Sequence, residues 1–170
     1  MLIDVVSAEE ILSVEEVRDY LKLNPDNDEE DTIETYITAA REYCEMRTGR
    51  TIALTEYSVS VESPGKTLIV PRPTILEVTS VTCDGVAIGY TYNYRSITFN
   101  EEPHGTVVVN YVSGYRKCPK ELRVAMLLLI GHWYAHREAV YVSTGSVTSK
   151  STSVAMGVDA ILNQFKVWWF

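Results

Sequence analysis

The chain has 170 residues, a net charge of -8 and three cysteines. This length predicts one domain, or one domain with an insertion, that needs no disulfide bonds, and the odd number of widely spaced cysteines favours a reducing compartment. The acidic balance excludes a protein whose whole surface wraps nucleic acid, because phosphate neutralisation needs clustered Lys and Arg. The N-terminus does not fit a secretory signal, and the apolar run Val124 to Ile130 is far shorter than the roughly 20 residues that span a bilayer. We therefore expect a soluble protein without a membrane partner.

The first half of the chain predicts two helices. Ser13 and Glu16 have the spacing of a capping box and open a short helix that ends near Lys22. After a break at Pro25, a second helix runs from about Asp28 to Thr48, with acids in its first turn and Gly49 in position to cap it. Its stripe of core residues comprises Ile33, Tyr36, Ile37, Ala40, Cys44 and Arg47. At roughly 30 Å, this helix is too long for the first one to cover, so a second long helix is expected beside it.

The pattern then changes to period two. Tyr57, Val59 and Val61 alternate with polar residues, as do Val107, Val109 and Tyr111 near the other end of this region. Turn signals stand at Pro64-Gly65, Asp84-Gly85 and His104-Gly105. The sequence therefore predicts about six short strands between Ile52 and Val112, arranged as an antiparallel meander.

The third predicted helix begins at Pro119, a residue suited to a first helical turn. Its run from Val124 to Ile130 holds no polar residue, so it should be covered on every side, either by the domain alone or with the help of other copies. The segment Tyr141 to Ser153 is interpreted as a mobile loop whose alternating valines also suit an edge strand against a partner. A last helix, about Val158 to Phe165, leads to three aromatic residues that pack either on the body or on another subunit: Trp168, Trp169 and Phe170.

These elements predict an α+β fold. A small helical bundle of about four helices carries an antiparallel β-sheet inserted between its second and third helices. Residues 1–50 form the first half of the helical body, 51–112 the inserted β subdomain, and 113–170 the second half with a flexible loop at 141–156 and the C-terminal helix.

Residues with catalytic potential do not form a recognisable site. His132 and His136 have the helical spacing of two metal ligands and Glu138 is near, but Trp133 stands where the catalytic zinc motif needs a glutamate, and no third ligand is indicated. Ser113-Gly114-Tyr115 and the serines at 143 and 146 do not fit a nucleophile elbow. We therefore predict no enzyme and no catalytic, cofactor or metal site. A metal-binding enzyme that uses the two histidines is the alternative of a different class.

Charge suggests a surface of contact instead. Basic residues gather around the joint between the last strand and the third helix, notably Arg116 and Lys117, while acids gather at the start of the second helix, from Asp26 to Asp31. In a ring of copies, the basic group would face either a neighbour's acidic helix start or DNA in a channel. The predicted subunit or partner interface comprises Trp168, Trp169, Phe170, Val142, Val147, Arg116 and Lys117.

Two halves of the sequence carry a family resemblance. The stretch from Leu12 to Leu23, the acids from Asp28 to Asp31, and the segment from Ile37 to Arg50 that ends in Thr-Gly-Arg resemble the head-to-tail connector (adaptor) family of tailed bacteriophages. In the second half, Tyr111 to Tyr115 and Pro119 to Tyr134 resemble the segment in which that family enters its central helix. The sheet resembles an insertion that longer members carry.

This resemblance implies a structural virion protein without cofactors. Such a protein forms a ring, typically of twelve copies, that docks on the portal protein after DNA packaging and offers a platform to a neck or tail-completion protein. Genomic DNA passes through its channel without sequence-specific binding. The protein would lie in the virion neck after assembly in the host bacterial cytoplasm. Another neck or tail-completion structural protein is the closest alternative.

Overall fold

The computed structural model describes residues 1–24, 29–136 and 150–167. It contains four helices and two antiparallel sheets, which confirms the α+β class. The chain divides into a strand unit, Met1–Glu9 with Gly49–Lys117, and a helical unit, Glu10–Thr48 with Cys118–Phe170.

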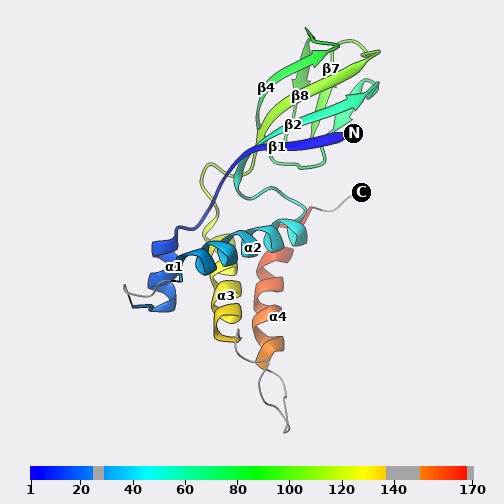
Figure 1. Cartoon of the computed structure of the whole chain (residues 1–170). Helices are drawn as coiled ribbons and strands as arrows, with labels where there is room; N and C mark the ends of the chain where they lie inside the picture. Colours follow the sequence, from blue (N-terminus) through cyan, green and yellow to red (C-terminus); the bar gives the residue numbers. More distant parts are fainter. Residues whose placement is uncertain (25–28, 137–149, 168–170) are drawn as a thin grey trace. The chain divides into compact units, whose positions relative to one another are not determined.

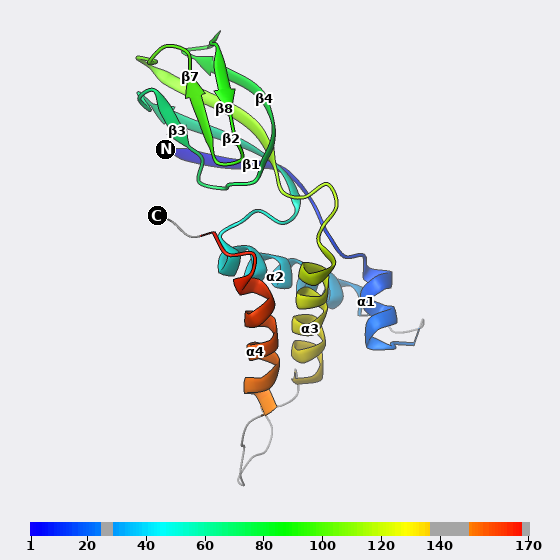
Figure 2. The same cartoon turned by 180° about the vertical axis from the view of Figure 1, so that it is seen from behind.

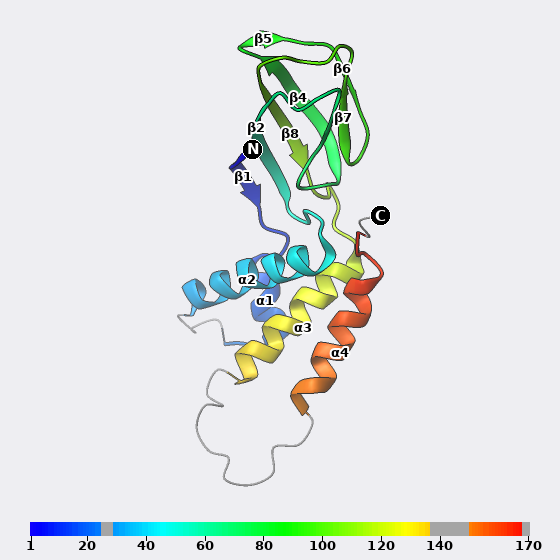
Figure 3. The same cartoon turned by 90° about the vertical axis from the view of Figure 1, so that its right-hand side faces the viewer.

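The helical unit is built from α1 (Val14–Leu21), α2 (Glu30–Thr48), α3 (Lys120–His136) and α4 (Lys150–Asn163). α3 and α4 run antiparallel, side by side, and α2 crosses both (Figures 1 and 3). The predicted cap of α1 is confirmed, since the Ser13 hydroxyl accepts a bond from the Glu16 amide at 3.2 Å. The Glu16 carboxylate binds the Arg123 guanidinium of α3. Gly49 has a φ of 68° directly after α2, which confirms the predicted helix end.

The end of the helical unit differs from the prediction. α4 begins at Lys150, well before the predicted Val158 and inside the predicted loop. The chain after it returns to the end of α2, where the Val167 amide donates to the Thr48 carbonyl at 2.8 Å. Arg47 and Asp159 add an ion pair at 2.6 Å between α2 and α4.

The strand unit has two sheets. The first has the order β1-β2-β8-β4-β5 and comprises β1 (Leu2–Glu9), β2 (Leu54–Glu62), β8 (Thr106–Ser113), β4 (Ile75–Cys83) and β5 (Val86–Ala87). The second has the order β3-β7-β6 and comprises β3 (Thr67–Ile69), β7 (Ser96–Phe99) and β6 (Tyr90–Tyr92). Between the sheets lies a core that includes Val59, Ile97, Phe99 and Val109 (Figure 2).

Two features of this unit correct the prediction. The pairing is antiparallel, but the order is no meander, because β8 lies between β2 and β4 although it is last in sequence. The first residues belong to the sheet: β1 pairs with β2 from Leu2↔Ser60 to Glu9↔Leu54, whereas the sequence assigned them to the helical body.

α3 is deeply buried on one side and partly exposed on the other. Its fully or nearly fully buried residues are Leu122, Ala125, Met126, Leu129 and Ile130. Val124 is 47% exposed, and Leu127 and Leu128 are half-buried. Of the two alternatives left open by the sequence, coverage by this chain alone does not extend to Val124, so help from other copies stays the alternative for that part of the run.

Candidate functional site

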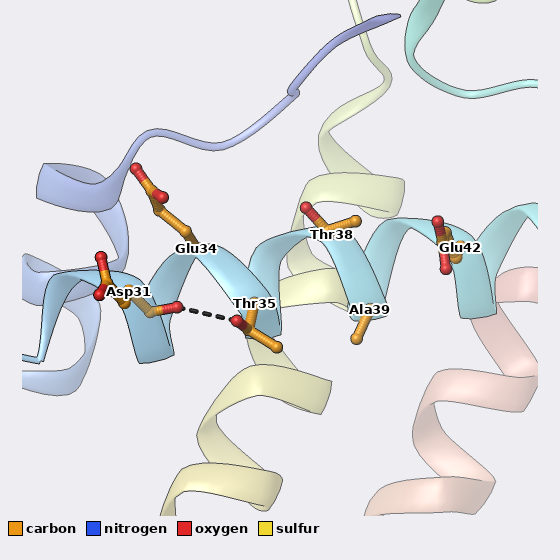
Figure 4. Close-up of a pocket in the computed structure, with 6 residues that line it drawn as sticks. All are labelled: Asp31, Glu34, Thr35, Thr38, Ala39 and Glu42. Atoms are coloured by element: carbon orange, nitrogen blue, oxygen red, sulfur yellow. Dashed lines mark hydrogen bonds between the residues drawn. The ribbon is translucent and has the colours of Figure 1, made fainter. Parts of the chain in front are cut away.

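An acidic hollow lies on the exposed side of α2. It measures about 560 Å³ and is lined by Asp31, Glu34, Thr35, Thr38, Ala39 and Glu42, which we call the acidic α2 face (Figure 4). The helical repeat explains this arrangement, because residues three and four apart share one face of a helix. The opposite side of α2 buries Ile33, Ile37, Ala40 and Cys44 in the core. The stripe predicted from sequence is thereby confirmed for these four residues, while Arg47 is exposed and Tyr36 is half-buried.

Small side chains, those of Thr35, Thr38 and Ala39, lie between the carboxylates along α2 (Figure 4). The Thr35 hydroxyl donates to the Asp31 carbonyl at 2.8 Å, so it is engaged with its own helix. Asp31 and Glu34 stand at one end and Glu42 at the other (Figure 4). In the part of the chain that the structure describes, no basic group forms an ion pair with Asp31 or Glu34, so the hollow keeps its negative charge.

Arg41, beside the hollow, forms its two shorter ion pairs with Glu10 and Glu45, which do not line the hollow. Its guanidinium binds Glu10 at 3.0 Å and Glu45 at 3.2 Å, and the Thr38 hydroxyl donates to Glu10 at 3.0 Å. Burial by itself would lower the pKa of Arg41, but the bonds to Glu10 and the charges around it outweigh burial and raise that pKa above its ordinary value. Glu42 forms a longer ion pair with Arg41 at 3.9 Å, which offsets part of its charge, but its side chain is 66% exposed and stays accessible to another cation.

A second charged surface lies where the first sheet ends. Arg72, Arg116 and Lys117, which we call the basic end, lie in the strand unit and are all exposed. The buried Ser113 hydroxyl holds the two segments together by donating to the Pro73 carbonyl at 3.0 Å. Arg116 is 72% exposed and reaches Glu77 at 3.6 Å, a pair that solvent weakens. The predicted interface residues Arg116 and Lys117 are thus accessible.

The other predicted interface residues lie outside the described residues. These are Trp168, Trp169, Phe170, Val142 and Val147.

An apolar edge strand was not predicted. All eight residues of β1 are exposed, including Leu2, Val5 and Val6, and β1 stands at the edge of its sheet. The sequence signal was present in the apolar content of these residues, but a shift of register between Val5 and Ser7 breaks the alternation that identifies a strand.

The histidines and cysteines considered as catalytic candidates make contacts within the fold or are buried in it. The His136 Nδ1 atom lies 2.7 Å from the His132 carbonyl oxygen, and the rings are 4.2 Å apart on α3. Within residues 1–24, 29–136 and 150–167, no three His, Cys, Asp or Glu side chains are placed to hold a metal ion. Burial raises the pKa of the Cys44 thiol to about 12 and that of Cys118 to about 11, so both stay protonated near neutral pH.

No helix among the described residues combines the length and apolar character that crossing a membrane requires.

Solved structures share this fold. A chain in the neck of an empty gene transfer agent (GTA) particle, computed with C6 symmetry, matches with a TM-score of 0.76 at 18% identity over 100% of this chain and 97% of that one. A chain in the virion of the native GTA particle gives 0.75 at 18% identity with the same coverage. A chain in the neck of the native particle, computed with C12 symmetry, gives 0.68 at 18% identity over 97% of both chains. No curated protein matches this sequence.

A family model described as head completion protein matches residues 10–167. This match agrees with the resemblance seen in the sequence and defines a structural protein of the head-to-tail connector class. The chain belongs to the head completion protein family.

Proposed function

We propose that copies of this chain form a ring in the neck of a tailed phage or a phage-like particle and join the DNA-filled head to the neck or tail. The observation that carries this proposal is the family match over nearly the whole chain. The fold shared with chains from GTA necks, which were computed with C6 and C12 symmetry, supports a symmetric assembly. A ring of twelve copies would agree with the number that the sequence resemblance implies and with the C12 symmetry of one of these necks.

Exposed apolar groups support association with other copies or partners. Val124 is 47% exposed on α3, and β1 exposes large apolar residues along its length. Edge strands and apolar patches of this kind usually mark contact surfaces in proteins that remain in solution. In the ring, the portal protein would contact one side and a neck or tail-completion protein the other.

The same proposal assigns roles to the remaining features. The strand unit is an insertion into the helical body that offers extra contact surface, and the last residues, Trp168 to Phe170, dock on a partner. The net charge of -8 suits a channel that DNA passes without adhering. A structural rather than a catalytic role agrees with the description of the family as head completion protein.

A particle complementation experiment tests this function. A host that produces the particles and lacks this gene should accumulate DNA-filled heads without tails, and expression of the chain in trans should restore joined particles seen by negative-stain microscopy. Joined particles in the absence of the chain would contradict the proposal.

The same experiment separates the closest alternative. Heads purified from a tail-deficient background should carry the chain if it is a head-side connector. Recovery of the chain with free tails instead would identify a tail-completion protein.

A further inference from the structure

The acidic α2 face is a shallow, open surface that carries the charge to bind long basic side chains. Small residues line its middle, and carboxylates stand at both ends, with Asp31 and Glu34 at one and Glu42 at the other (Figure 4). The methylene stem of an Arg or Lys can lie over Thr35, Thr38 and Ala39 while its charged head reaches a carboxylate. Arg41 is bound to Glu10 and Glu45 and lies 3.9 Å from Glu42, so of the three lining carboxylates Asp31 and Glu34 are the ones without an ion pair among the described residues.

The basic end supplies groups of the complementary kind. Basic residues that form ion pairs with carboxylates include Arg18, Arg41, Arg47, Arg116 and Arg123. Among these, Arg116 has by far the most exposed side chain, and its distance of 3.6 Å from Glu77 leaves it able to exchange partners. Exposed Arg72 and Lys117 flank it at the same end of the sheet.

The overall charge indicates where this basic end would bind. Two copies that each carry -8 repel one another, and a contact that places exposed basic groups of one against acids of the other offsets this repulsion. A symmetric contact that paired each patch with itself would oppose like charges. A contact between two different patches is heterologous and repeats from copy to copy, which is the kind of contact that closes a ring.

We propose that the basic end of one copy (Arg72, Arg116 and Lys117) docks on the acidic α2 face of a second copy. This inference rests on the proposed ring and assigns the surfaces that join its members. The contact is strengthened at low salt, because exposed charges are screened within about 10 Å at 0.1 M ionic strength.

Charge reversal with exchange of partners tests the proposal. The full chain is studied by sedimentation velocity at high protein concentration over a series of salt concentrations. One variant carries Glu34→Lys and Glu42→Lys, and the other carries Arg72→Glu and Lys117→Glu. A control variant, Glu62→Lys with Lys66→Glu, changes exposed charges elsewhere in the strand unit. Circular dichroism verifies that each variant is folded.

The expected results form a pattern that fold defects do not produce. The native chain and the control associate, and the association weakens as salt rises. Each reversed variant alone associates roughly tenfold more weakly or worse, and an equimolar mixture of the two regains association through the matched pair of reversed surfaces. Unchanged association of either variant, failure of the mixture, or a native chain that stays monomeric at low salt would each overturn the proposal.

A DNA-binding measurement tests the alternative role of the basic end, which is contact with DNA in the channel. Fluorescence anisotropy with short duplex DNA should show no difference between the native chain and Arg72→Glu/Lys117→Glu. Loss of DNA binding with association intact would assign the basic end to the DNA channel and overturn the docking. The connector function would survive that outcome, because complementation of joined particles measures it independently.

Discussion

Replacing Leu122 and Val124 separately measures how the apolar run of α3 is divided. Leu122 is 0% exposed, so Leu122→Ala loses the transfer energy of its side chain and leaves a cavity, at a cost of about 2–5 kcal/mol. Val124 is 47% exposed. Val124→Ala removes two methyl groups, whose full burial would contribute about 0.8 kcal/mol each to stability. Because the side chain is about half exposed, the loss is ~0.8 kcal/mol. The higher helix propensity of alanine offsets about 0.5 kcal/mol of this loss. Val124→Ala should therefore cost only ~0.3 kcal/mol.

Urea unfolding followed by far-UV circular dichroism measures both variants. At about 2–4 °C per kcal/mol for a chain of this size, Leu122→Ala should also lower the Tm by roughly 5–15 °C, while Val124→Ala leaves it nearly unchanged. Equal losses for the two variants would show that Val124 is part of the core. A loss below about 1 kcal/mol for Leu122→Ala would refute the packing described for α3.

Three further predictions concern single residues. Arg41→Met should cost about 3 kcal/mol or more in urea unfolding, because it removes the guanidinium that pairs with the nearly buried Glu45 carboxylate. Arg116→Met should show no clear change, because its pair with Glu77 is exposed. Gly114→Ala should unfold the strand unit or cost more than about 3 kcal/mol, because a Cβ would lie 2.0 Å from the Ala53 carbonyl oxygen at a φ of 114°. The control Gly65→Ala has open space around its Cβ and should cost about 1–2 kcal/mol. A folded, fully stable Gly114→Ala chain would contradict this prediction. Burial raises the pKa of the Cys44 thiol from 9.0 to about 12, so the folded state keeps a proton that the unfolded state releases; the free energy of unfolding should fall as pH rises between 9 and 12, and Cys44→Ala should flatten that slope.

Local signals in the sequence predicted the helices well. The cap at Ser13 and the end of α2 at Gly49 depend on residues within a few positions of each other, and the structure confirms both. The start of α4 was missed because Ser151, Thr152 and Ser153 have weak helix propensity, although the helix includes them.

Strand order was beyond the reach of local signals. Period two shows which side chains of β2 and β8 face the core, but it carries no information on which strands pair. β1 was missed for a related reason: it pairs with β2, far along the chain, and its bulge near Val6 interrupts the pattern.

The charged surfaces were only half predictable. Arg116 and Lys117 stand next to each other in sequence, so their cluster was visible, but Arg72 joins them only because β4 and β8 bring their ends together. The acids of α2 were recognised as a group at the helix start. The structure adds that small residues lie between the carboxylates of Asp31, Glu34 and Glu42 along α2, while Arg41 forms its two shorter ion pairs with other carboxylates.

The apolar run of α3 shows why sequence alone left the assembly question open. Because every position from Val124 to Ile130 is apolar, the run has no periodicity that could distinguish a covered side from an uncovered one. The structure makes that distinction: Met126 and Ile130 lie in the core of the single chain, whereas Val124 faces outward and Leu128 is half-buried. Apolar residues that are partly exposed add little to the stability of the single chain, so their presence is better explained by a surface that is covered after assembly. Complementary charges raise the rate of association, whereas apolar contacts lower the rate of dissociation. This chain exposes groups of both kinds.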